Sequence, residues 1–132
     1  MEGTPAAGYH DDPTIPDEAD LWRRIPPWHF VMDENSGRVR PSSAAFDDDP
    51  NGSPMSVVLA AESNGPESVL AGHPGFALAS FKVRVARESN QGVARDPLPD
   101  EPAHALVFGT KTKSIRRRLA KEATWVVPPP FP

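Results

Sequence analysis

The chain has 132 residues, of which 38% are hydrophobic and 24% are charged, and its formal net charge at pH 7 is −4. This length fits one domain with a modest hydrophobic core. The chain contains no cysteine, which excludes disulfides, thiol nucleophiles and thiolate metal sites. The N-terminus is unlike a signal peptide, and no apolar run reaches the roughly 18 residues that a membrane helix needs. The composition therefore predicts a cytoplasmic protein that makes no membrane contact.

Charge is unevenly distributed along the chain. Residues 1–50 contain 11 acidic and 4 basic residues, whereas residues 104–132 contain 6 basic residues and 1 acidic residue. Such asymmetry is typical of a polyanion-binding end, or of an acidic segment that folds back over a basic face. The net acidity of the whole chain argues against nucleic-acid binding, because a dedicated nucleic-acid-binding domain is normally basic.

Composition also divides the chain into three parts. Residues 1–17 are acidic and poor in large apolar side chains, so we expect a disordered acidic tail. Residues 18–127 are predicted to form a single α+β domain. Residues 128–132 read Pro-Pro-Pro-Phe-Pro and predict a Pro-rich tail in an extended conformation, of a kind that protein partners recognise.

The first elements are short. Leu21–Ile25 is predicted as a short helix or a first strand that Pro26 and Pro27 must end. Residues 28–32 are rich in strand formers and residues 33–37 form a turn cluster, after which residues 38–46 run from a short strand into a loop.

The later elements include the most regular patterns in the chain. Further strands are expected at residues 55–61, 76–87, 103–108 and 125–127, with one or two helical turns at residues 66–71. Thr112–Ala123 is predicted as an amphipathic helix, because its apolar side chains recur on one face. The sum is α+β: a mainly antiparallel sheet of five or six strands with one C-terminal amphipathic helix.

The run Arg38-Val39-Arg40-Pro41-Ser42-Ser43-Ala44-Ala45-Phe46 is the first candidate site. Arginine presents a planar fork of donors suited to phosphate or carboxylate, and serine hydroxyls add short hydrogen bonds to the same anion. Arg38, Arg40, Ser42 and Ser43 are therefore the predicted ligand-binding residues. The alternative is a solvated turn in which the serines cap nearby backbone groups.

His104 is the second candidate, in an apolar segment just after a loop that contains Asp96, Asp100 and Glu101. An imidazole acts as a general acid or base near neutral pH, and a neighbouring carboxylate orients it. If His104 met Ser43, the two would form a hydroxyl–imidazole pair for catalysis. The alternative is a strand histidine bonded to a neighbouring carbonyl group.

The basic stretch Lys111–Lys121 is the third candidate, as a surface for nucleic acid or an acidic partner. A solvated helix face is the favoured interpretation, because cations towards a helix C-terminus are stabilised by the helix dipole in any case. Aromatic side chains are not interleaved with these cations, which argues against a single-strand-binding surface.

No metal site is predicted. Asp47, Asp49, Asn51 and Gly52 match the first half of a calcium-binding loop, but the twelfth position is Val58 where a bidentate Glu is needed. The segment is therefore interpreted as an acidic turn. His29 and His73 have no second ligand at helical spacing, so zinc is unsupported.

Three segments carry a resemblance to known sequences: Leu21-Trp22-Arg23-Arg24-Ile25, Arg40-Pro41-Ser42-Ser43-Ala44-Ala45-Phe46 and Pro102-Ala103-His104-Ala105-Leu106-Val107. They resemble small uncharacterised bacterial proteins, a likeness that implies no activity. A fainter resemblance is to ADP-ribosyltransferase-like domains, in which an early-strand Arg and a later Ser motif line a dinucleotide cleft. Arg23 and Ser42-Ser43 occur here in that order, while the late-strand catalytic Glu of such domains has no clear counterpart.

Two functions from different classes follow from the sequence. The first is a non-catalytic binding or accessory protein that recognises an anionic ligand or a protein partner. The second is a small enzyme acting on a nucleotide or another phosphorylated substrate, with Arg40 as anion clamp and His104 as acid or base. No cofactor is expected, and a homodimer through an exposed edge strand or the tryptophans stays open.

Overall fold

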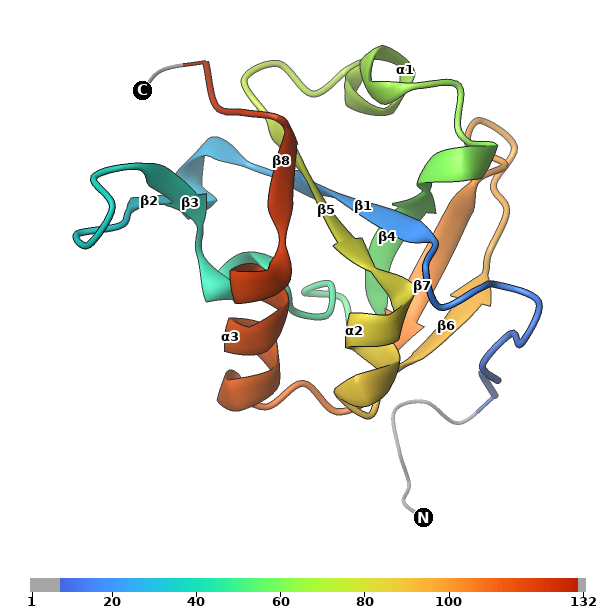
Figure 1. The fold of residues 1–132 in the computed structure, drawn as a ribbon. Helices are drawn as coiled ribbons and strands as arrows, with labels where there is room; N and C mark the ends of the chain where they lie inside the picture. Colours follow the sequence, from blue (N-terminus) through green and yellow to red (C-terminus); the bar gives the residue numbers. More distant parts are fainter. Residues whose placement is uncertain (1–7, 131–132) are drawn as a thin grey trace.

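The computed structural model describes residues 8–130 of the chain. They form an α+β fold built on a six-stranded sheet of order β6-β7-β4-β1-β5-β8, with a separate two-stranded hairpin (Figure 1). Every strand pairing is antiparallel, so the predicted fold class and sheet type are confirmed. The strands are β1 Asp20–Ile25, β2 Phe30–Met32, β3 Val39–Pro41, β4 Met55–Leu59, β5 Ala77–Lys82, β6 Gly92–Arg95, β7 His104–Phe108 and β8 Thr124–Val127. The helices are α1 Pro66–Leu70, α2 Val83–Glu88 and α3 Lys113–Glu122, with 3₁₀ turns η1 Pro27–His29, η2 Ser43–Ala45 and η3 Ala60–Glu62.

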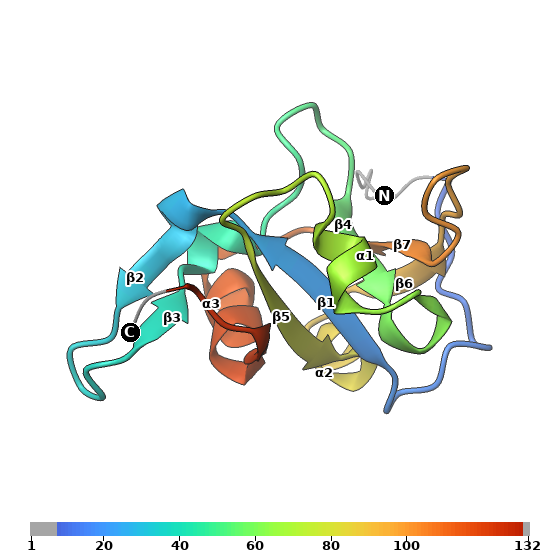
Figure 2. The same cartoon turned by 90° about the horizontal axis from the view of Figure 1, so that it is seen from above.

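Helices lie against both faces of the sheet (Figures 1 and 2). One face packs against α2, α3 and η2, and its core includes Leu21, Val57, Phe81 and Leu119. The other face packs against α1 and carries a smaller apolar cluster of Val58, Val69, Leu78 and Ala103. Because the central strands are covered on both sides, they read as nearly continuous apolar runs rather than as alternating ones. All five residues of β7 are buried for this reason.

The segment predicted as one long strand over residues 76–87 is instead a strand followed by a helix. β5 ends at Lys82 and α2 begins at Val83. The main-chain N–H groups of Val83 and Arg84 donate to the carbonyl oxygens of Ala19 and Asp17, which ends the ladder with β1. Val83, Val85 and Ala86 are all buried. The apolar residues that alternate in the sequence like those of a strand are therefore the residues with which this short helix packs against the core.

The acidic N-terminal segment is not a free tail in the part that the structure describes. Ile15 is only 1% exposed and belongs to the main core, and the N–H group of Asp12 donates to the carbonyl oxygen of Val93. Asp11, Asp12 and Asp17 form ion pairs with Arg87 and Arg95. The acidic segment therefore pairs with cations of α2 and β6 rather than with the basic C-terminal helix. Residues 1–7 and 131–132 of the two expected tails lie outside the described residues.

The helix α3 carries five of the six basic residues of the C-terminal segment, and none of the five is buried. Thr112 caps its N-terminus, because the threonine side chain accepts a hydrogen bond from the N–H group of Ile115. Leu119 is fully buried against the sheet, and the cations lie on other faces. Within residues 8–130, no helix is long and apolar enough to cross a membrane.

Candidate functional site

The acidic turn Asp47–Asp49 contacts two cations, of which the half-buried Arg23 on β1 is the first. Its guanidinium donates to the carbonyl oxygens of Ala45, Ser56 and Asp47, at 2.9, 2.8 and 3.4 Å. These bonds commit Arg23 to backbone groups of the loop between η2 and β4. In ADP-ribosyltransferase-like domains the corresponding arginine would line an open cleft. Here the guanidinium of Arg23 is instead bonded to backbone carbonyl groups of a loop.

Lys111 is the second cation, and its side chain is only 1% exposed. Its ammonium group donates to Asp48 at 2.6 Å and to the carbonyl oxygens of Val107 and Gly109 at 2.8 and 3.4 Å. Burial lowers the pKa of Lys111, and the hydrogen bond and charge of Asp48 oppose that shift. The acidic turn thus serves as the counter-charge for the buried Lys111 and the half-buried Arg23. Among the described residues, no three His, Asp or Glu side chains gather in a way that holds a metal ion.

A groove of about 500 Å³ lies between β3 and α3, and we call it the β3–α3 groove. Its lining includes Arg40 on β3, Arg117 and Lys121 on α3, and Trp125 on β8. Asp33, just after β2, is the one acidic residue among the lining side chains. The β2–β3 hairpin forms one wall of the groove and contacts β8 next to it. In this contact the indole N–H group of Trp125 donates to the carbonyl oxygen of Val39 at 3.1 Å.

The cations of β3, its flank and α3 form no ion pair within residues 8–130, apart from Arg118, which pairs with Glu88 at 2.6 Å. Outside β3, its flank and α3, each Lys or Arg pairs with an acidic side chain or, like Arg23, lies beside the acidic turn. Within residues 8–130, the Lys and Arg side chains other than Arg23 that form no ion pair are Arg38, Arg40, Lys113, Arg116, Arg117 and Lys121. An acidic protein therefore concentrates its uncompensated positive charge on one side.

The predicted ligand-binding residues of the Arg/Ser run do not act as one unit. Arg40 lines the β3–α3 groove, while Arg38 is exposed just before β3 and does not line it. The hydroxyl oxygen of Ser42 accepts a hydrogen bond from the N–H group of Ala44 at 3.1 Å and caps η2, which is the alternative that the sequence left open. Ser43 is the first residue of η2 and does not line the groove either.

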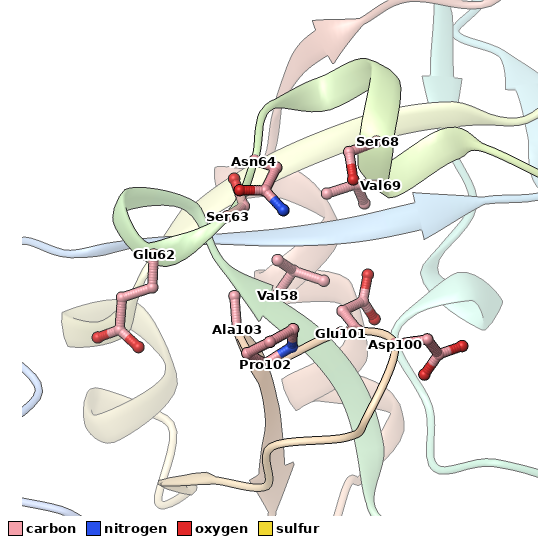
Figure 3. Close-up of a pocket in the computed structure, with 10 residues that line it drawn as sticks. All are labelled: Val58, Glu62, Ser63, Asn64, Ser68, Val69, Asp100, Glu101, Pro102 and Ala103. Atoms are coloured by element: carbon pink, nitrogen blue, oxygen red, sulfur yellow. The ribbon is translucent and has the colours of Figure 1, made fainter.

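A second cleft, of about 490 Å³, lies on the opposite face of the sheet beneath α1, and we call it the α1 cleft. Its polar lining consists of Arg24, Ser56, Ser68, His73, Asp100, Glu101 and His104. A smaller hollow of about 100 Å³ adjoins it and shares Ser68, Asp100 and Glu101 (Figure 3). We call this the α1 hollow.

His104 is 7% exposed and is held by the residue that follows β6. Its Nδ1 atom lies 3.0 Å from the carbonyl oxygen of Asp96 and 3.1 Å from a carboxylate oxygen of the same residue. Both oxygens accept hydrogen bonds, so Nδ1 carries the proton and Nε2 of the neutral ring is an acceptor. Within residues 8–130, Nε2 has no hydrogen-bond partner.

Arg24 and His73 complete the polar wall of the α1 cleft. Arg24 donates to the carbonyl oxygen of Val69 at 2.6 Å and to the Glu101 carboxylate at 2.7 Å. Burial lowers the pKa of His73, the charge of Arg24 lowers it further, and Glu101 opposes the shift. His73 is consequently a neutral imidazole at pH 7.

Ser43 and His104, the predicted catalytic pair, lie on opposite sides of the sheet. His104 is paired with Val58 across β7 and β4, and side chains of directly opposed residues share a face. That face is the one beneath α1, whereas η2 packs with α3 on the other. Arg40 and His104 likewise line different clefts. The structure therefore does not bring the Arg/Ser/His constellation together.

Sequence reasoning missed residues of both clefts. Arg117 and Lys121 were interpreted as part of a solvated helix face, although their spacing of four places them side by side on α3. Arg24 and His73 were not predicted as site residues. The one signal in the sequence was a charged residue, Arg24, within a predicted strand that also contains large apolar residues.

In comparisons with known proteins, no protein-family model, no curated protein and no solved structure matches the chain.

Proposed function

We propose that the protein binds an anionic ligand, one that bears phosphate or carboxylate groups, in the β3–α3 groove. The observation that carries this proposal is the convergence of unpaired cations on the groove. Arg40, Arg117 and Lys121 line it, and none of them forms an ion pair within residues 8–130. Outside β3, its flank and α3, the Lys and Arg side chains of residues 8–130 instead pair with carboxylates or, like Arg23, lie beside the acidic turn.

The groove also has the chemistry that such a ligand needs. Two guanidinium groups supply planar forks for bidentate bonds to phosphate or carboxylate, and Lys121 adds a point charge. Asp33 carries one negative charge against the three positive charges of the groove, so the lining keeps a net positive charge. Trp125 adds an aromatic wall beside the cations, which suits a ligand with a flat or apolar part.

Binding is supported here better than catalysis. The imidazole that a small Arg/Ser/His enzyme would use lies in the α1 cleft, and Ser43 lies outside the groove. The groove itself offers charge, hydrogen-bond donors and an aromatic ring. A binding or accessory protein is therefore the function that this arrangement favours.

Isothermal titration calorimetry with inorganic pyrophosphate at low ionic strength tests the proposal. We expect Arg117→Gln to weaken binding about tenfold, since a hydrogen bond to a charged group contributes about 1.5–3 kcal/mol. Lys113→Gln is the matched control: it removes one exposed, unpaired cation from the same helix without altering the groove lining. Equal losses from the two variants would mean that only the overall charge of α3 matters, and would overturn the proposal.

A hexaglutamate peptide serves as the second arm of the same titration. Tighter binding of pyrophosphate identifies a small phosphorylated ligand, and tighter binding of the peptide identifies an acidic segment of a protein. Absence of saturable binding for both probes refutes the groove as an anion site.

A further inference from the structure

The α1 cleft and the α1 hollow lie on the face of the sheet that the proposed anion site does not use. Figure 3 shows the hollow with Val58, Val69 and Ala103 towards its centre and the carboxylates of Asp100 and Glu101 at one end. Val58, Val69 and Ala103 belong to one buried apolar cluster. The hollow thus has an apolar floor and a carboxylate rim.

The charge of this region is opposite to that of the β3–α3 groove. Arg24 is the one Lys or Arg in the lining of either cavity, and its ion pair with Glu101 neutralises both partners. Asp100 is exposed and makes no ion pair or hydrogen bond within residues 8–130. With His73 neutral at pH 7, one negative charge in the cleft stays unbalanced.

His104 adds an oriented hydrogen-bond acceptor to the carboxylates of the cleft. Its side chain is 9% exposed, its Nδ1 atom is occupied by Asp96, and its Nε2 acceptor has no partner in the described chain. Asp96 fixes the ring orientation, so Nε2 is a pre-positioned acceptor. Nε2 is not sealed inside the protein, so it stays available to a hydrogen-bond donor that enters the cleft.

We propose that the α1 cleft binds the ammonium group of an alkylamine, with its aliphatic stem over the apolar floor of the α1 hollow. The ammonium group has three donors, and the cavity provides acceptors in Asp100, Glu101 and His104 Nε2. The stem is then removed from water against Val58, Val69 and Ala103, which stabilises the complex through apolar burial. Both a free small amine and the side chain of a lysine in a peptide have this chemistry.

Histidine NMR with n-butylamine as the probe tests this site. We expect saturable binding that shifts the Nε2 resonance of His104, because Nε2 gains a hydrogen-bond donor while Nδ1 keeps its own. The neutral analogue 1-butanol and the anion butyrate are expected to bind more weakly. Binding of either analogue as tightly as butylamine overturns the proposal, as does an unchanged His104 resonance at saturation.

Two variants test the role of the unpaired charge. Asp100→Asn is expected to weaken butylamine binding about threefold, which corresponds to the contribution of an exposed ion pair. The variant should fold normally, because Asp100 is exposed and forms no hydrogen bond or ion pair within residues 8–130. Glu67→Gln removes an exposed carboxylate from α1 that lines neither cavity, and should leave binding unchanged. Equal affinities for Asp100→Asn and the unaltered protein contradict the proposal.

A capped lysine, Nα-acetyl-lysine N-methylamide, separates the two sources of the ammonium group. Affinity equal to that of butylamine assigns the site to lysine side chains, and clearly lower affinity assigns it to free amines. Both assignments are independent of the β3–α3 groove, so failure of one site leaves the test of the other unaffected.

Discussion

Lys111→Met tests how much the buried ion pair between Lys111 and the acidic turn contributes to the free energy of unfolding. Methionine keeps an unbranched side chain of similar length and removes only the charge and the donors. The substitution deletes the ion pair with Asp48 at 2.6 Å and the bonds to the carbonyl oxygens of Val107 and Gly109. It also leaves the Asp48 carboxylate without its cation.

The magnitude follows from the exposure of the two partners. Removing one partner from a fully buried ion pair costs about 3–5 kcal/mol, whereas an exposed pair contributes about 0–1 kcal/mol. The Lys111 side chain is buried, but the Asp48 side chain is 29% exposed and regains part of its hydration. We therefore expect the free energy of unfolding to fall by about 2–3 kcal/mol, a large part of the roughly 5–15 kcal/mol typical of a domain.

Urea unfolding followed by tryptophan fluorescence measures this loss. With a slope of about 2 kcal/mol per M, the midpoint should fall by about 1 M. The double variant Lys111→Met with Asp48→Asn should be more stable than Lys111→Met alone, because it no longer leaves an unpaired carboxylate. A loss below about 0.5 kcal/mol for Lys111→Met, or a double variant that is no more stable, would refute this reasoning.

Two further predictions concern stability. Burial and the charge of Arg23 lower the pKa of His29 in the folded state, so below pH 6.5 the unfolded chain takes up a proton that the folded chain excludes, and the free energy of unfolding falls as the pH falls. His29→Gln should flatten that part of a series of urea titrations between pH 7 and about 5, and an unchanged profile would contradict the assignment. A Cβ atom on Gly92 would lie 2.2 Å from the ring of Phe108, so Gly92→Ala should lower the free energy of unfolding by about 1–3 kcal/mol. Adding Phe108→Leu should restore part of that loss in the same urea assay, and no recovery would show that the ring is not the obstacle.

The sequence predicted the strands that bury an unbroken apolar run. Residues 55–61 were predicted as a buried strand and contain β4, and residues 103–108 contain β7. Both are interior strands with a neighbour on each side, where the local pattern and the tertiary environment agree. Residues 76–87 were mispredicted because Phe81, Val83 and Val85 alternate like a strand, while α2 uses Val83, Val85 and Ala86 for packing. Local periodicity alone does not separate these two cases.

The candidate sites depended more heavily on tertiary contacts. Arg40 was recognised from its residue type and its turn, but its partners Arg117 and Lys121 lie about 80 positions further along the chain. They meet because α3 packs against η2 in the same core and the indole of Trp125 on β8 donates to Val39 on β3. The acidic segment at residues 11–17 illustrates the converse, since its composition suggested disorder and its ion pairs with Arg87 and Arg95 hold it on the protein.

The sequence by itself determined the α+β class, the antiparallel sheet and the chemical type of each candidate side chain, because these follow from composition and from local patterns of apolar residues. Only the tertiary structure decided which of those side chains face one another. It separated Ser43 from His104 by the thickness of the sheet, joined Arg40 to α3, and placed His104 with Asp96 beneath α1. The physical reason is that a sheet places alternate residues on opposite faces, and which helix covers each face is set by crossings between distant strands.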